Sequence, residues 1–152
     1  MSTFRHFEDF EPGQVIPLGS KLVDRDEVIA FATEFDPQPF HLDEEAGKAS
    51  VLGGLAASGW HTSSMLMRLM CDGLLLASSC NGSPGIDEVR WMRPVFPGDT
   101  LNATAEVLAT RALRSRPGLG VVTLRMTLVN QHGVPVMTLE NSILFGRREN
   151  AA

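Results

Sequence analysis

The sequence lacks the features by which membrane, secreted and metal-binding proteins are usually recognised. It has only two cysteines, Cys71 and Cys80, and no C-x-x-C spacing, so we expect neither a structural disulfide nor a metal site. No apolar run approaches the roughly 18 residues that a membrane span requires. Residues 2–10 mix charged and aromatic residues and lack the apolar segment of a signal peptide, so a cytoplasmic location is expected.

Basic charge is also scarce. The chain carries 13 lysines and arginines against 18 aspartates and glutamates, and the net charge of −5 argues against nucleic-acid binding as its main task. The only basic cluster is Arg111, Arg114 and Arg116. It is typical of a solvated loop or strand edge, but arginine also pairs well with phosphate, so a contact for a phosphorylated ligand is a second interpretation.

The remaining composition is that of an ordinary globular domain. The 152 residues are 43% hydrophobic and 20% charged, enough to bury a core in a single domain over residues 1–152. The first predicted strand covers residues 15–23. Its alternation places Ile16, Leu18 and Leu22 on one face, which we expect to be buried.

Helices are predicted after this strand, and their starts are marked by capping residues. Asp24, with Glu27 three residues later, forms a capping box for a helix that Asp36-Pro37 ends. Asp43 is the expected N-cap of a short helix over residues 44–49.

The longest predicted helix extends from Ala56 to about Ala77 and is apolar around most of its circumference, which is typical of a buried helix. The sequence after it favours strands. Four are expected, over residues 86–95, 101–108, 120–129 and 134–145. A strand, a helical half and four further strands predict an α+β fold, in which an antiparallel sheet covers one long buried helix.

Residues 36–43, Asp-Pro-Gln-Pro-Phe-His-Leu-Asp, are the most informative stretch of the chain. They place the carboxylate of Asp36 and the imidazole of His41 five residues apart in a loop that two prolines stiffen. A rigid loop can direct an acid and a base toward the same point in space, which is the geometry that acid–base catalysis needs. A structural role is the alternative, because Asp before Pro commonly forms turns and His41 can be a partly buried residue bonded to backbone.

This segment resembles the signature of the MaoC-like dehydratases, also called the (R)-specific enoyl-CoA hydratase family: Asp, one residue, Asn-Pro, one residue, His, one residue, Asp. Gln38 stands in place of the asparagine. Gly59 matches a glycine at the start of the family's central helix, with Ser58 where histidine is common. Residues 93–100, Arg-Pro-Val-Phe-Pro-Gly-Asp-Thr, are similar to the family's Pro-Val-x-x-Gly-Asp turn, and the resemblance covers nearly the whole chain.

The resemblance implies a hotdog fold, in which a curved antiparallel sheet wraps around the central helix. It also implies a homodimer, or a higher oligomer, with active sites near the subunit interface. The implied activity is that of a hydro-lyase, which adds water to an enoyl thioester or removes it from a 3-hydroxyacyl thioester. The substrate is carried on coenzyme A or acyl carrier protein, and no cofactor is implied beyond the coenzyme A of the substrate.

The resemblance also assigns roles to residues. Asp36 and His41 share one water and perform both proton transfers, and which of them is the base stays open because coupled groups titrate as a pair. The Gly59 N–H, at a helix N-terminus, binds the thioester oxygen on which enolate charge builds. The candidates for binding substrate around this centre are Gln38, Ser58, Trp60, His61 and Arg93.

Each assignment has a plainer alternative. Gly59 can serve tight packing of helix on sheet, Ser58 can be an N-cap, and Gln38 can hold the loop. His61 can be a core histidine. At the level of function, the departures at Gln38 and Ser58 leave a hotdog acyl-thioesterase open, and a non-catalytic partner subunit that binds acyl thioesters is a third hypothesis.

Overall fold

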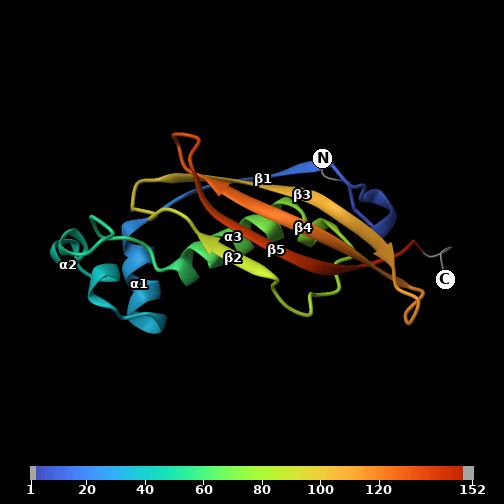
Figure 1. Cartoon of the computed structure of the whole chain (residues 1–152), viewed down its shortest axis with the longest axis horizontal. Helices are drawn as coiled ribbons and strands as arrows, with labels where there is room; N and C mark the ends of the chain where they lie inside the picture. The colour runs from blue at the N-terminus through green and yellow to red at the C-terminus, as the bar shows by residue number, and fades with distance from the viewer. Residues whose placement is uncertain (1–2, 149–152) are drawn as a thin grey trace.

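The computed structural model describes residues 3–148 and has the α+β hotdog arrangement that the sequence predicts. The helix α3 (Gly59–Gly73) lies along one face of the sheet, and α1 (Arg25–Phe35) and α2 (Glu44–Ala49) gather at one end of it (Figure 1). One antiparallel sheet runs in the order β1-β3-β4-β5-β2; its strands are β1 (Val15–Leu22), β2 (Glu88–Trp91), β3 (Thr100–Ala112), β4 (Leu119–Val129) and β5 (Pro135–Gly146). The short 3-10 turns are η1 (Phe7–Asp9), η2 (Pro39–His41) and η3 (Leu75–Ala77).

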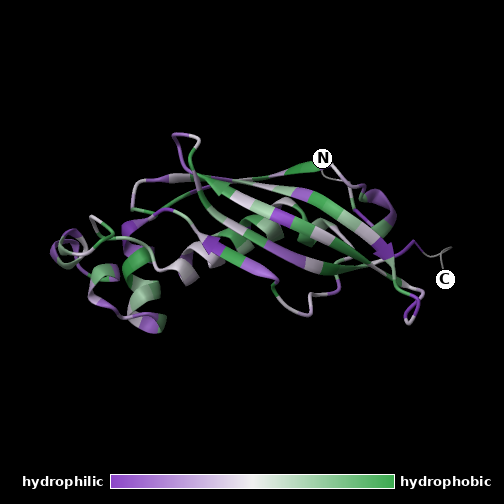
Figure 2. Cartoon of the chain, in the orientation of Figure 1, coloured by the Kyte–Doolittle hydropathy of each residue, from purple (hydrophilic) through white to green (hydrophobic). Residues whose placement is uncertain are grey.

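The core lies between α3 and the face of the sheet that it covers. Strand β4 shows the predicted alternation, visible as changing colour along the strand in Figure 2. The side chains that it contributes to the core cluster are Val122, Leu124, Met126 and Leu128. From the helix, Leu66 and Met70 are buried in the same cluster. This packing stabilises the sheet and the helix together, so that the N-terminal end of α3 has a fixed position for the site.

Strand β1 departs from its predicted pattern at one residue. Ile16 and Leu18 are buried as expected, but Leu22 is 63% exposed. The pairing of β1 with β3 shifts register between Pro17 and Gly19, where Gly19 has a φ of 106°. A bulge inserts one residue and reverses the faces beyond it, so Leu22 points outward.

Helix α3 is shorter than its apolar pattern predicts, at both ends. Ala56 and Ala57 are extended, because their N–H groups donate to the carbonyls of Phe40 and Val95 instead of to a helical turn. At the other end a Cβ on Gly73 would lie 2.5 Å from the Leu18 carbonyl oxygen, so the helix stops where its backbone meets β1. Among residues 3–148 no helix is long and apolar enough to cross a bilayer.

Two strand boundaries also differ from those predicted. Strand β2 is restricted to residues 88–91, because the N–H groups of Met92 and Arg93 both donate to Val136 and Pro94 has no N–H. Strand β3 continues beyond residue 108 to Ala112, because it stays paired with β4. The shortening of β2 frees residues 92–95 to line the pocket described next.

Candidate active site

The loop after α1 brings Asp36 and His41 together. Asp36 caps the C-terminus of α1. The chain then folds on itself, with the Gln38 N–H donating to the Asp36 carbonyl at 2.8 Å and the His41 N–H donating to the Gln38 carbonyl at 2.9 Å. These short-range bonds, with the fixed φ of Pro37 and Pro39, make the segment rigid. The predicted loop is therefore present, and its second half is the 3-10 turn η2.

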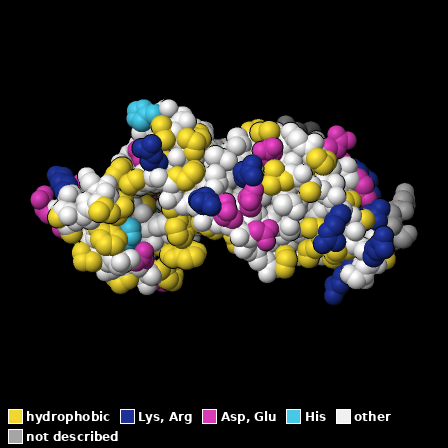
Figure 3. Space-filling view, in the orientation of Figure 1, with side chains coloured by type: hydrophobic (Ala, Val, Ile, Leu, Met, Phe, Trp, Pro, Cys, Tyr) yellow, Lys and Arg dark blue, Asp and Glu magenta, His cyan; other side chains and the backbone are white. Residues whose placement is uncertain are grey.

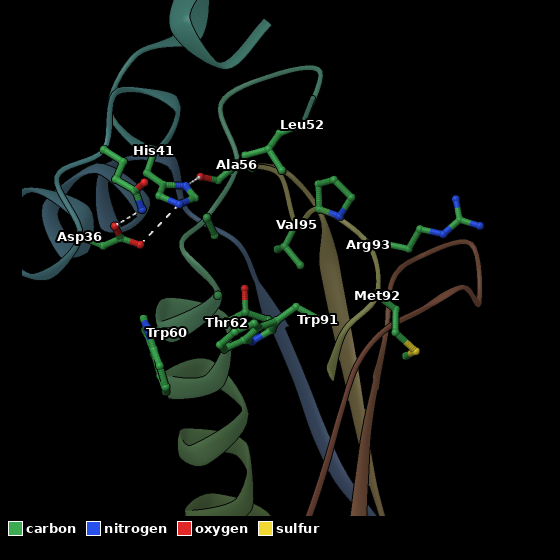
Figure 4. Close-up of a pocket in the computed structure, with 14 residues that line it drawn as sticks. Asp36, His41, Leu52, Ala56, Trp60, Thr62, Trp91, Met92, Arg93 and Val95 are labelled. Carbon is green, nitrogen blue, oxygen red and sulfur yellow. Dashed lines mark hydrogen bonds and ion pairs between the residues drawn. The ribbon is translucent and has the colours of Figure 1, made fainter. Parts of the chain in front are cut away.

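The carboxylate and the imidazole face each other. His41 Nε2 lies 3.4 Å from Asp36 Oδ2 (Figure 4). His41 Nδ1 lies 2.7 Å from the carbonyl oxygen of Ala56, which can only accept, so Nδ1 carries a proton and donates it. In the neutral ring Nε2 is then the free, basic nitrogen, and it faces the carboxylate. A hydrogen bond to backbone was the expected sign of a purely structural histidine. Here the bond to the Ala56 carbonyl instead orients the ring so that Nε2 faces Asp36.

Two further side chains hold the Asp36 carboxylate. Ser58 Oγ donates to Oδ2 at 2.6 Å, and Gln38 Nε2 donates to Oδ1 at 2.7 Å. The Ser58 bond is the main cause that lowers the pKa of Asp36 below its ordinary value, with the Gln38 bond and the charge of His41 adding to it and burial opposing it. Asp36 is therefore an ionised carboxylate at neutral pH.

Ser58 does not contact the pocket, contrary to its predicted place among substrate-binding residues. Its side chain is fully buried, donates to Asp36, and accepts from the Trp60 N–H at 3.3 Å. It is the N-cap of α3, which was the alternative interpretation. One hydroxyl thus joins the helix terminus to the carboxylate. Gln38 likewise holds the loop through Asp36, although it also borders the pocket.

Gly59 is the first residue of α3, where backbone N–H groups have no partner within the helix. Within residues 3–148 no hydrogen bond uses its N–H. The absent side chain has a packing reason as well: a Cβ here would lie 2.7 Å from ring atoms Cδ2 and Cε2 of Trp91. The glycine therefore accommodates Trp91 of β2, and this close packing of sheet on helix was the alternative to an oxyanion role.

The dyad and Gly59 open into one pocket of about 380 Å³ (Figure 4). Apart from Asp36, Gln38, His41 and Gly59, its lining residues are Leu52, Ala56, Ala57, Trp60, Thr62, Trp91, Met92, Arg93, Pro94 and Val95. The lining is mostly apolar, and the polar side chains of Asp36, Gln38 and His41 lie together at one end of it. This combination is typical of sites that bind small organic molecules.

His61 does not line this pocket, contrary to its predicted place there. The ring is buried and stacks on Phe31 of α1, with centroids 4.9 Å apart and an angle of 14° between the planes. Burial lowers its pKa, Lys21 adds to this effect, and Glu27 opposes it. Its Nδ1 has no partner among the described residues. His61 is a core histidine that joins α1 to α3.

The arginines are placed differently from one another. Arg93 borders the pocket, but its guanidinium is directed away from Asp36 and His41 (Figure 4). The hairpin between β3 and β4, which contains Arg114 and Arg116, lies at the opposite end of the molecule from α1 and α2 (Figure 1). Of these arginines, Arg93 is the one that lines the pocket.

Trp91 lines the pocket but is not among the site residues that the sequence predicts. Trp91 belongs to none of the recognised motifs, and it reaches Gly59 only because β2 pairs with β5 at the sheet edge beside α3. Its Nε1 donates to Ser63 Oγ at 3.2 Å, and its ring meets that of Trp60 edge-on at 5.2 Å between centroids. No local sequence signal encodes such a contact.

Comparisons with known proteins agree on one family. A family described as "MaoC like domain" matches residues 9–130. The crystal structure of a MaoC-like dehydratase from Rhodospirillum rubrum is 42% identical, with a TM-score of 0.88 and coverage of 95% of this chain and 98% of that one. The uncharacterized protein YdeM of Bacillus subtilis is 31% identical over 92% of this chain and 98% of its own length. The (R)-hydratase from A. caviae involved in PHA biosynthesis is 28% identical, with a TM-score of 0.72 and coverage of 90% and 97%.

Proposed function

Because the chain belongs to the MaoC-like dehydratase family, we propose that it is a hydro-lyase acting on an enoyl or 3-hydroxyacyl thioester. The observation that carries the proposal is the contact of Asp36 with His41 at one end of an apolar pocket that Gly59 also lines. The similarity to the (R)-hydratase from A. caviae supports the reaction class. The proposal covers the reaction class and leaves the acyl group and its carrier unspecified.

The pair supplies the proton transfers of a hydration. A water that hydrogen-bonds to both His41 Nε2 and Asp36 Oδ2 from the pocket side loses a proton to the pair as its oxygen bonds to C3 of the enoyl group. The π electrons move toward the thioester, and the pair returns one proton to C2. Dehydration follows the same steps in reverse. The pair ends each turnover in its starting protonation state, so no further reactant is needed.

The negative charge that develops on the thioester oxygen requires a donor. In our proposal the Gly59 N–H fills this role, because it lies at the positive end of the α3 dipole and borders the same pocket as the dyad. Arg93 at the pocket edge is the candidate for pairing with a phosphate of coenzyme A. Both assignments follow from position, and each is open to mutational test.

Hydration of crotonyl-CoA tests the proposal. We expect the enoyl absorbance to fall without release of free thiol, and 3-hydroxybutyryl-CoA to be recovered as product. Free thiol would instead indicate the thioesterase. Tight binding of the thioester without any reaction would indicate the non-catalytic binding subunit. His132→Ala, at the exposed β4–β5 turn, is the matched control for His41→Ala, and only the second should abolish turnover.

We also propose that the protein forms a homodimer through β2 and the adjoining face of α3. Strand β2 is an edge of the sheet, and exposed edges of this kind pair readily with another strand. Large apolar side chains are exposed beside it: Trp60, Met67, Ile86, Trp91 and Met92. A patch of this kind is typical of a protein interface.

The oligomeric state in solution tests this interface. Met67→Lys places a charge on the exposed face of α3 and should convert the dimer to a monomer in light scattering. Leu22→Lys is the control, because Leu22 is also apolar and exposed but lies on β1 at the other edge of the sheet. A monomeric wild type, or equal effects of the two substitutions, would contradict the proposed interface.

A further inference from the structure

Gly59 carries the proposed donor to the thioester oxygen, yet a glycine does not hold its own backbone in one conformation. Without a Cβ it rotates about φ and ψ more freely than any other residue. It is also the first residue of α3, and its N–H has no partner within residues 3–148. A donor that stabilises developing charge is effective only when it is oriented before the reaction, so the surroundings of Gly59 must fix its backbone.

The indole of Trp91 covers the side of Gly59 on which a side chain would project (Figure 4). A Cβ on Gly59 would lie 2.7 Å from both Cδ2 and Cε2 of Trp91, and 3.1 Å from Cζ2. Cδ2 and Cε2 are the two atoms that the fused rings of indole share, so the ring meets the glycine with its face and not with its edge. This contact restricts the rotation that the missing side chain would otherwise allow.

A chain of two hydrogen bonds connects the same indole to the carbonyl of Gly59. Trp91 Nε1 donates to Ser63 Oγ at 3.2 Å, and Ser63 Oγ donates to the Gly59 carbonyl oxygen at 2.9 Å. The Met137 sulfur, 3.9 Å from Ser63 Oγ, is a much weaker acceptor, so the Ser63 proton is directed to the carbonyl. Because indole Nε1 can only donate, the direction of the chain is fixed, and consecutive bonds of this kind strengthen each other.

These contacts anchor Gly59 on one side, and Ser58 anchors it on the other. Ser58 Oγ donates to Asp36 at 2.6 Å and accepts from the Trp60 N–H at 3.3 Å. The peptide group that contains the Gly59 N–H therefore lies between two anchored residues. Trp91 is 45% exposed and leaves the pocket open, so its contact with the Gly59 backbone is the feature that gives it a role.

We propose that Trp91 and Ser63 are positioning residues, which together hold the Gly59 N–H in the orientation that binds the thioester oxygen. The inference rests on the proposed hydro-lyase function. Ser63 does not line the pocket, and it acts only through Gly59 and the indole. Loss of either contact should slow the chemical step more than it weakens substrate binding, because the charge on the thioester oxygen is largest in the transition state.

The first test is kcat and KM for the hydration of crotonyl-CoA. We expect kcat to fall by ~10- to ~100-fold in Ser63→Ala and in Trp91→Phe, which keeps an aromatic face but loses the N–H, while KM changes much less. Because the two residues form one chain, the double variant should lose no more than Ser63→Ala alone.

Ser64→Ala is the matched control for Ser63→Ala. The Ser64 hydroxyl makes the same kind of bond within α3, to the Trp60 carbonyl at 2.8 Å, but on the exposed face of the helix, so kcat should be unchanged. Wild-type kcat in Ser63→Ala, or equal losses in Ser63→Ala and Ser64→Ala, would overturn the inference.

Infrared spectroscopy of bound butyryl-CoA separates this inference from the proposed function. Butyryl-CoA has no double bond to hydrate, and a hydrogen bond to its isotopically labelled thioester carbonyl lowers the stretching frequency. We expect a downward shift on binding that is smaller in Ser63→Ala and Trp91→Phe and retained in Ser64→Ala. That result would support the positioning role even if no enoyl thioester were hydrated. Equal shifts in all these proteins, with crotonyl-CoA hydrated by the wild type, would refute the positioning role and leave the hydro-lyase proposal intact.

Discussion

The polar and apolar halves of the pocket are built in opposite ways. In the polar half His41 and Ser58 are buried, and Asp36 is held by donors at 2.6 and 2.7 Å on its two oxygens. In the apolar half Trp60 and Trp91 are 62% and 45% exposed, and Trp91 is held by a single side-chain hydrogen bond. The space-filling view shows apolar side chains at the surface at this end of the molecule (Figure 3).

The difference separates chemistry from recognition. Proton transfer depends on the fixed geometry of a few atoms, and one copy of the chain supplies that geometry with bonds of its own. Substrate recognition depends on excluding water from apolar surface, which the exposed half achieves only when a ligand or a second copy covers it. Substitutions in the polar half should therefore change the rate, and substitutions of exposed apolar side chains such as Trp60 and Met92 should change substrate choice and assembly.

The largest expected effect comes from the dyad. Asp36→Asn should keep the fold and lower turnover of crotonyl-CoA by ~10²-fold or more, because the amide can neither take nor return a proton. Circular dichroism and the melting temperature check the fold. Turnover like that of the wild type in a folded Asp36→Asn protein would remove Asp36 from the mechanism.

The next effect concerns Gly59, where two explanations compete for the absence of a side chain: close approach of the thioester, and packing against Trp91. Gly59→Ala should lower activity, because a Cβ would collide with the Trp91 ring and crowd the ligand. The same substitution in a Trp91→Ala background distinguishes the reasons. If close approach of the thioester requires the glycine, activity falls in that background as well. If the double variant is as active as Trp91→Ala alone, the glycine serves only to pack Trp91.

A smaller effect, on rate and on its pH dependence, should come from Ser58. A hydrogen bond to a charged group contributes about 1.5–3 kcal/mol, so Ser58→Ala should lower turnover by ~10-fold or somewhat more. Because the Ser58 bond lowers the pKa of Asp36, its loss raises that pKa and moves the acidic limb of the pH–rate profile toward neutral pH. Ser64→Ala, on the exposed face of the same helix, is the matched control. An unmoved acidic limb in Ser58→Ala would refute this role.

The smallest effect lies outside the pocket, at His61. Burial lowers the pKa of His61, so below its ordinary value of ~6.5 the unfolded chain takes up a proton that the folded chain does not. Stability should therefore fall as the pH falls from about 7 to 5.5, and His61→Gln should flatten that dependence. Denaturant unfolding at several pH values measures it. Asp36, whose lowered pKa acts at more acidic pH, does not contribute in this range.

Features encoded by neighbouring residues could be predicted from the sequence. Asp24 and Asp43 are N-caps as predicted and accept from the N–H groups three residues on, although Glu27 does not complete the capping box because its carboxylate pairs with Lys21. The alternation of β4 and the proximity of Asp36 to His41 also follow from local spacing. Each of these depends on a side chain or a turn within a few residues, which a single sequence specifies.

Features decided by distant partners could not be predicted. The start of α3 depends on Val95 and Phe40, which bind the backbone of Ala56 and Ala57. The exposure of Leu22 follows from a bulge in its pairing with β3. Trp91 meets Gly59 only through the order of the sheet. In each case the deciding group is far away in the sequence, so the secondary-structure propensities of the local residues cannot reveal it.

The central claim is that Asp36 and His41 act as one unit on one water, and a double-mutant cycle tests it most directly. The measurement is kcat/KM for crotonyl-CoA hydration in Asp36→Asn, His41→Ala and the double variant. Groups that act as a unit are strongly non-additive, so we predict that each single variant loses about as much as the double variant. Losses that multiply in the double variant, or a folded single variant with wild-type activity, would contradict the claim.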